Sequence, residues 1–133
     1  MSAPAAFAIH QGTTERQWNF VESIEGYARH GIRAVTVRRS LVEEHGLAQA
    51  ARLISDAGLK VLGVSRCASL TEEDPSRIAL NHEENRRAIA LTAELNGTNL
   101  AMISSSLPEG SRDLAGARAR ARDALARLLP EAR

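Results

Sequence analysis

The chain has 133 residues, of which 44% are hydrophobic and 25% charged, and this is enough for one globular domain with a buried core. The formal net charge of +1 and an aromatic content of 3% argue against a nucleic-acid partner, which would need a basic surface or stacking rings. The single cysteine, Cys67, excludes an intrachain disulfide and predicts a reducing, cytoplasmic location. No signal peptide is recognisable at the N-terminus, and no apolar run approaches the roughly 20 residues of a membrane span, so we expect no membrane partner.

Strands and helices alternate along the predicted chain. The capping-box spacing of Thr14 and Gln17 predicts that the first helix begins near residue 15, and Asp113 is a candidate N-cap for the last helix. Residues 40–46 are predicted to be a plain connection. Short apolar runs predict strands at 7–10, 34–37, 61–64 and 100–103, and helical spacing of apolar residues predicts helices at 15–30, 47–57, 78–95 and from 114 onward.

A helix, a glycine and a short apolar strand follow one another three times, at residues 27–37, 54–65 and 93–104. The glycines are Gly31, Gly58 and Gly97, and glycine is the usual residue just past a helix C-terminus. This repeat is typical of βα units, and the continuous apolar strands are typical of a parallel sheet covered on both faces. The sequence therefore predicts an α/β fold with four βα units in a single domain over residues 1–133. Both an open doubly wound sheet and a barrel fit this pattern.

Polar residues follow the predicted strands, at the end where parallel α/β proteins bind their ligands. His10, Arg38 and Arg66 are the candidates for binding a polar small molecule, and the serines in equivalent places are weaker ones. A strand that reaches solvent must end in something polar in any case, so the two interpretations stand side by side.

Other chemistry is less well supported by the sequence. Cys67 is a candidate nucleophile with His10 as its base, but a lone cysteine is more often a small buried residue. His82 and Glu83 lack the spacing of an HExxH zinc motif. The turn after the first strand is not a glycine-rich phosphate loop, which argues against a nucleotide-binding sheet.

Several segments together carry a family resemblance. They are His10 with Thr13, Thr14 and Trp18, and the stretches 28–39, 46–66 and 84–103, in this order. With these segments the chain resembles the xylose isomerase-like TIM-barrel superfamily of sugar and sugar-phosphate isomerases and epimerases. The resemblance departs from the family pattern at Glu84, where Asp is common, and at Asn96, Gly97 and Thr98, which replace a Leu/Gly/Ala turn.

The family barrel has eight βα units, so the resemblance implies that this chain corresponds to the N-terminal half. In the family, a divalent metal (Mn, Mg or Zn) and paired glutamates on later strands isomerise a sugar by proton transfer. The resemblance therefore implies an isomerase of carbohydrate metabolism, with no catalytic residue and no metal ligand in this chain. It leaves His10, Arg38 and Arg66 as residues of the substrate rim.

Three hypotheses remain open at this point. The chain is the N-terminal half of a longer isomerase or epimerase. Alternatively, it is a half-barrel that forms a homo-oligomer through the open edges of its first and fourth strands, since unpaired edges invite pairing. The third hypothesis, from another class, is a non-catalytic α/β domain that binds a small, sugar-like molecule. Whether the chain is itself an enzyme is left undecided by the sequence.

Overall fold

The computed structural model describes residues 7–133, so the N-terminal residues at which a signal peptide would start lie outside the described range. Two compact units can be distinguished. The first, here called the sheet unit, runs to Arg66 and also contains Leu91–Ala101, and the second, here called the helical unit, contains Cys67–Ala90 and Met102–Arg133. The single domain predicted over residues 1–133 stays a prediction.

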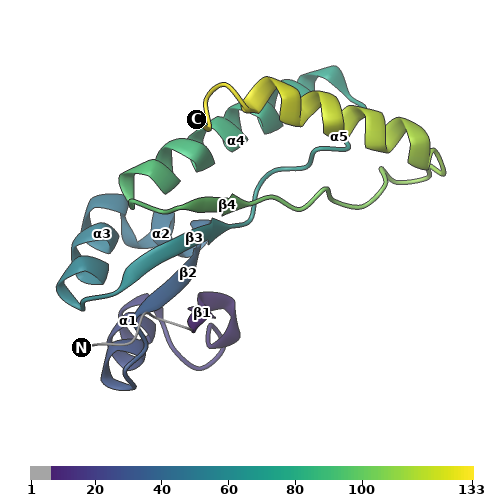
Figure 1. Ribbon diagram of the computed structural model, residues 1–133. Coiled ribbons are helices and arrows are strands. Elements are labelled where there is room, and N and C mark those ends of the chain that lie inside the picture. The colour runs from purple at the N-terminus through teal and green to yellow at the C-terminus, as the bar shows by residue number, and fades with distance from the viewer. Residues whose placement is uncertain (1–6) are drawn as a thin grey trace. The chain divides into compact units, whose positions relative to one another are not determined.

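The sheet unit contains four parallel strands (Figure 1). The strands and helices of the described chain are, in order, β1 (Ala8–His10), the 3-10 helix η1 (Gln11–Thr13), α1 (Phe20–Arg29), β2 (Ala34–Arg38), α2 (Arg39–His45), α3 (Leu47–Asp56), β3 (Lys60–Ser65), α4 (Pro75–Glu94), β4 (Asn99–Ala101) and α5 (Leu114–Leu128). The four predicted strands and their βα order are confirmed. Within residues 7–133, no helix has the length and apolar character needed to span a membrane.

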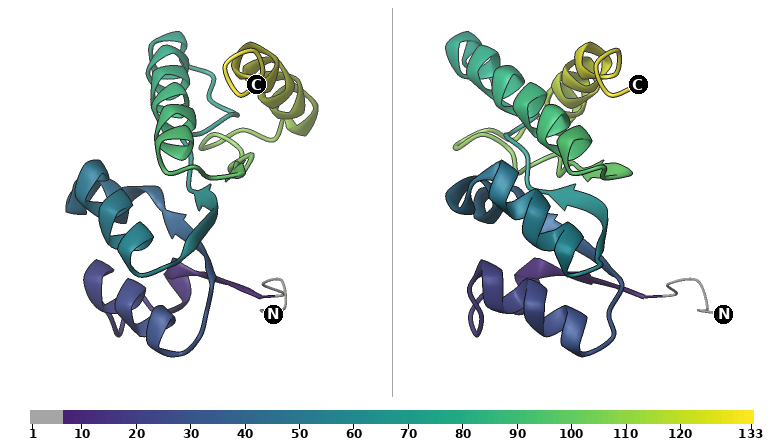
Figure 2. Two further views of the ribbon diagram at one scale, coloured as in Figure 1. Left: turned by 60° about the vertical axis from the view of Figure 1, so that its left-hand side comes forward. Right: turned by 90° about the vertical axis from the view of Figure 1, so that its left-hand side faces the viewer.

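Strand order decides between the two architectures that the sequence left open. The order in the sheet is β1-β2-β3-β4, and every neighbouring pair is parallel. A doubly wound sheet reverses its strand order at a switch point, whereas a barrel adds each strand beside the previous one. Figure 2 shows α1 and α3 on the same face of the strands, as right-handed crossovers in a sequential sheet require. The fold is therefore that of four consecutive units of a TIM barrel.

The core of the sheet unit lies between the strands and these helices. Ile24 and Tyr27 of α1 and Val35 and Val37 of β2 are almost completely buried there, together with Val64 of β3. Burying such side chains contributes about 1.5–3 kcal/mol each. The cluster fixes which face of each strand points to the helices. Because successive side chains of a strand alternate between the two faces, the intervening residues lie on the opposite face.

The structure contains the predicted turn between a helix and a strand in all three copies of the repeat. In the first two, Gly31 and Gly58 have φ angles of 75° and 73°, and the next residue donates its N–H to the carbonyl five residues earlier, Ile32 to Tyr27 and Leu59 to Ile54.

The third copy is shifted by one residue. Asn96 has the left-handed conformation, with φ 53°, and Gly97 donates to the Thr92 carbonyl. A Cβ on Gly97 would lie 2.9 Å from Thr92 Cγ2, so this glycine is required by close contact rather than by its φ angle.

Two predictions of secondary structure are wrong. The first long helix begins at Phe20 and not near residue 15, because the capping box is formed by Asn19 and Glu22, with both hydrogen bonds at 2.9 Å, and not by Thr14 and Gln17. The segment predicted to be a connection is instead α2, which is anchored by the fully buried Val42 and is followed by Gly46 with φ 97°. Such a short helix has too few turns to show a periodic pattern.

The helical unit holds its loops by side-chain hydrogen bonds. Asn85, which is 1% exposed, accepts from the Ala68 N–H at 2.8 Å and donates to the Ala68 carbonyl at 3.3 Å. Thr71 Oγ1 donates to the Ser106 carbonyl at 2.7 Å and thereby joins the loops that follow β3 and β4. Asp113 caps α5 by accepting from the Gly116 N–H at 2.8 Å, as the sequence predicted.

Candidate functional site

The three predicted rim residues come to the same edge of the sheet. His10 is the last residue of β1 and Arg38 is the last residue of β2, while Arg66 directly follows Ser65, the last residue of β3. Because the strands are parallel, these positions are their carboxyl ends, and Arg38 is in register with Ser65. We call His10, Arg38 and Arg66 the rim residues.

His10 is held on both ring nitrogens. Nδ1 accepts a hydrogen bond from the Gly12 N–H at 3.0 Å, and Nε2 lies 2.7 Å from Ser65 Oγ. Since Nδ1 is an acceptor, a neutral imidazole must carry its proton on Nε2 and donate it to Ser65. A Cβ on Gly12 would lie 2.9 Å from Nδ1, so the absence of a side chain there permits this close approach.

Electrostatics also favour the neutral ring. Burial lowers the pKa of His10 from its ordinary value of 6.5, and the positive charges of Arg38 and Arg66 lower it further. A protonated ring would turn Nδ1–H against the N–H of Gly12. The arrangement therefore fixes His10 as a neutral hydrogen-bond donor toward Ser65 near neutral pH.

This geometry limits the chemistry at Ser65. The hydroxyl accepts from His10 and is oriented toward the Val37 carbonyl at 3.5 Å, so His10 is not placed to act as its general base. Both nitrogens of His10 are used, which gives no support to its predicted role as a base for the half-buried Cys67. The pair is suited to binding and orientation rather than nucleophilic catalysis.

The two arginines differ in how their charge is balanced. The Arg38 guanidinium contacts the carboxylate of Glu15, and its backbone N–H donates to Oε1 of the buried Gln11 at 3.1 Å. Arg66 is exposed, and it takes part in none of the hydrogen bonds or ion pairs recorded among residues 7–133. Within the described residues, Arg66 is therefore the cation of this edge that has no partner.

Arg66 also has an unusual backbone. Its φ angle is 79°, in the left-handed region that residues with a Cβ seldom adopt. Strain of this kind costs roughly 1–3 kcal/mol and is concentrated at functional sites.

Sequence reasoning missed the partners that hold the rim. The sequence ranks Ser65 below the charged residues, and it does not indicate that Glu15 and Gln11 are partners of Arg38. Gln11 is 1% exposed and bridges Ser23 Oγ of α1, at 3.1 Å, and the Arg38 backbone. A glutamine directly after a strand was the only available signal, and it does not reveal partners that are distant in sequence.

The residues present do not fit a divalent metal. Among residues 7–133, no group of three His, Cys, Asp or Glu side chains is close enough to hold a metal ion. At the rim, both nitrogens of His10 are engaged, and its charged neighbours Arg38 and Arg66 would repel a cation. His82 and Glu83 belong to no such group either.

Comparison with known proteins agrees with this fold. A protein from Sinorhizobium meliloti 1021, SMc04130, is 32% identical, with a TM-score of 0.90, over 95% of this chain and 46% of its own. The 3-keto-D-glucoside 4-epimerase YcjR from E. coli is 18% identical, with a TM-score of 0.70, over 86% of this chain and 47% of its own. A xylose isomerase domain protein from Alicyclobacillus acidocaldarius is 21% identical, with a TM-score of 0.64, over 94% of this chain and 46% of its own.

The chain thus spans about half the length of the solved structures it matches. No protein-family model matches the sequence. No curated protein matches it either. The fold predicted by the resemblance is confirmed: the chain carries half of a xylose isomerase-like TIM barrel. Other proteins with this fold include sugar epimerases and isomerases.

Proposed function

We propose that this chain forms the first half of a sugar isomerase- or epimerase-like barrel and contributes the substrate rim through His10, Arg38 and Arg66. The observation that carries the proposal is the convergence of these residues at the carboxyl ends of three consecutive parallel strands. That edge is where ligands bind in barrels of this class. The sugar substrate class is taken from the epimerases with the same fold.

Each rim residue has a binding role in this proposal. Arg66, which has no counter-ion among the described residues, donates to hydroxyl or carbonyl oxygens of the sugar. Ser65, which lies beside the rim residues and accepts a hydrogen bond from His10, presents its oxygen to a sugar hydroxyl. Arg38 is held by Glu15 and shapes the wall beside it. The proton transfer of an isomerisation is assigned to no residue of this chain, and neither is the family's divalent metal.

A binding experiment tests the proposal. Isothermal titration calorimetry with a panel of aldohexoses, ketohexoses and their phosphates should give at least one ligand with a measurable affinity. The Arg66→Gln variant should bind it about tenfold more weakly, because a charge-assisted hydrogen bond is lost. Arg33→Gln is the matched control, since Arg33 is an exposed arginine that precedes the same sheet's β2 at the opposite edge. Equal losses in both variants, or no binding by any sugar, would refute the proposal.

Two other hypotheses stay open, and the oligomeric state tests one of them. β1 and β4 each pair with a single strand of the described sheet, and a homo-oligomer joined at these edges would complete eight strands. Light scattering would then give twice the mass of one chain, while a monomer at high concentration would oppose this arrangement. A non-catalytic binding domain would bind a sugar without turnover after Mn²⁺ is added, and so would the first half of a barrel, because neither has a group of metal ligands among residues 7–133.

A further inference from the structure

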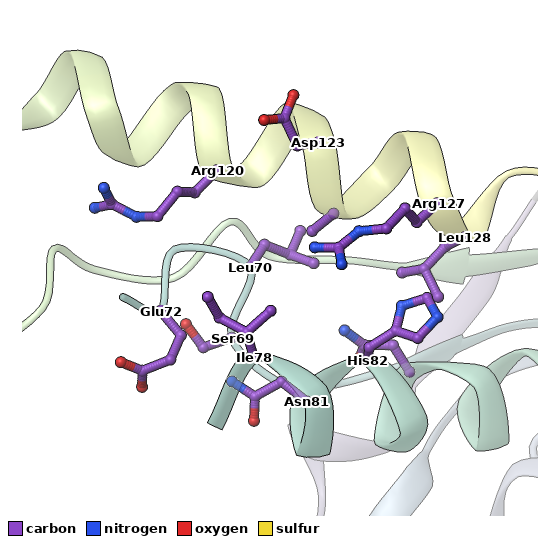
Figure 3. A pocket seen from close by; sticks show the side chains of 12 residues that line it. Ser69, Leu70, Glu72, Ile78, Asn81, His82, Arg120, Asp123, Arg127 and Leu128 are labelled. Carbon is purple, nitrogen blue, oxygen red and sulfur yellow. The ribbon is translucent and has the colours of Figure 1, made fainter. Parts of the chain in front are cut away.

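A cavity of about 110 Å³ lies within the helical unit, between α4 and α5 (Figure 3). Its polar lining includes His82 from α4 and Arg120 and Arg127 from α5, and its apolar lining includes Leu70, Ile78 and Leu128. None of these residues belongs to the rim. The cavity and the rim therefore share no residue, and a ligand of the cavity is not part of the function proposed for the rim.

Two buried side-chain nitrogens of the cavity lining have no hydrogen-bond partner among residues 7–133. His82 Nδ1 is shielded from solvent and has no partner among residues 7–133. Arg120 Nη2 is equally shielded, and it contacts Glu73 Oε1 at 3.0 Å as an ion pair but without hydrogen-bond geometry, while its Nε donates to the Thr71 carbonyl. Buried polar atoms are nearly always hydrogen-bonded, so unpartnered ones point to a missing partner.

Arg127 adds a third donor group. Figure 3 shows its guanidinium reaching from α5 into the space above α4. It takes part in none of the hydrogen bonds or ion pairs recorded for the described part of the chain. A guanidinium presents paired N–H groups that match a carboxylate in a bidentate manner.

The acidic residues of the lining are committed elsewhere. Glu72 accepts from the backbone N–H groups of Glu73 and Asp74, at 2.9 and 3.3 Å, and forms an ion pair with Arg77. Asp123 pairs with Arg122 at 3.2 Å, and its carboxylate points away from α4 in Figure 3. The uncommitted polar side chains of the lining are thus Arg127, His82 and Asn81. The guanidinium only donates and carries a positive charge, and the imidazole and the amide can also donate, so this set favours an anion.

Size and the apolar lining narrow the ligand further. A cavity of about 150 Å³ accommodates benzene, so this smaller one fits a few heavy atoms and not a sugar ring. Leu70, Ile78 and Leu128 offer a surface for a short hydrocarbon stem. We propose that the cavity between α4 and α5 binds a short aliphatic carboxylate, with Arg127 and His82 as donors to its oxygens and the apolar side chains around its stem.

Calorimetric titration of the whole chain tests this site with butyrate as the probe. Butyrate should bind with 1:1 stoichiometry, and its uncharged analogue butyramide at least about tenfold more weakly, because the guanidinium has no charge to pair with. Butylammonium should not bind. Inorganic phosphate binding as tightly as butyrate would contradict the assigned apolar stem, and equal binding of butyramide would contradict the anion site.

Variants locate the site. Arg127→Gln should weaken butyrate binding about tenfold, and His82→Leu should weaken it as well. Arg118→Gln is the matched control on the exposed face of α5, and it should bind like the wild type. Arg127 is itself exposed, so its variant is expected to fold, which far-UV circular dichroism verifies. Unchanged binding in Arg127→Gln and His82→Leu, or no binding of butyrate to the wild type, would overturn the proposal.

Discussion

Replacing Ser65 by alanine tests the arrangement that holds His10. The Ser65 hydroxyl lies 2.7 Å from His10 Nε2 and 3.5 Å from the Val37 carbonyl, and the residue is 7% exposed. Its removal leaves the Nε2–H without an acceptor, at a cost of about 1–3 kcal/mol for a buried group. Because His10 itself is partly reached by water, we expect the lower end, about 1 kcal/mol. For a chain of this length, the melting temperature should fall by about 3–5 °C.

Urea unfolding followed by circular dichroism measures this loss. Ser55→Ala removes an exposed serine of α3 and serves as the control, with an expected change within about 0.5 kcal/mol. His10→Asn keeps an acceptor for the Gly12 N–H but loses the contact with Ser65. The double variant should therefore lose less than the sum of the single losses, by about 1 kcal/mol. Additive losses would refute the hydrogen bond between His10 and Ser65.

Three further predictions concern pH, helix capping and the core. Burial and the charges of Arg38 and Arg66 lower the pKa of His10 in the folded chain below its ordinary value of 6.5. The His10 ring therefore binds a proton more tightly in the unfolded chain than in the folded chain. The wild type should thus lose stability on acidification from that pH through the lowered pKa, and His10→Asn should lose less over the same range in urea titrations. Asn19→Ala should cost about 1 kcal/mol by removing the N-cap of α1, whereas Asn19→Ser, which keeps a capping oxygen, should cost less; equal losses would contradict the capping role. Ile24→Ala should cost about 2–5 kcal/mol in calorimetry, because the side chain is fully buried, and a smaller loss would contradict its place in the core.

The fold could be predicted because its signals are local. A helix, a left-handed residue and an apolar strand follow one another within about a dozen residues, and the turns at Gly31 and Gly58 are what the sequence indicates. In the third turn the sequence predicts Gly97 as the left-handed residue. In the structure Asn96 has this conformation, and Gly97 is needed because a side chain there would be too close to Thr92. Among the amino acids, asparagine is second only to glycine in tolerating the left-handed conformation.

The choice between sheet and barrel could not be predicted from local signals. Strand order is a property of the folded chain, and the same βα repeat serves both architectures. The family resemblance favoured the barrel, and the sequential order of the sheet confirms it. The start of α1 was misplaced because Thr14 and Asn19 carry similar capping signals, and only the contacts of Glu22 distinguish them.

The position of the rim could be predicted, but not its chemistry. His10, Arg38 and Arg66 are predicted because they lie at or just past the ends of apolar strands, and these strand ends share one edge of the sheet. Their differences come from partners distant in sequence. Glu15 balances Arg38 across 23 residues, and Ser65 meets His10 across 55. Such pairs have no periodic signature, so the neutral state of His10 and the unpaired state of Arg66 emerge only from the structure.

Amide chemical-shift mapping during a sugar titration tests the central claim most directly. If the carboxyl ends of β1, β2 and β3 form a sugar-binding rim, saturating ligand should shift the backbone signals of His10, Arg38 and Arg66 and the ring nitrogens of His10. The signals of residues that line the cavity between α4 and α5 should stay in place. Shifts confined to that cavity, or signals unchanged by every sugar tested, would contradict the claim that this half-barrel binds sugars at its strand ends.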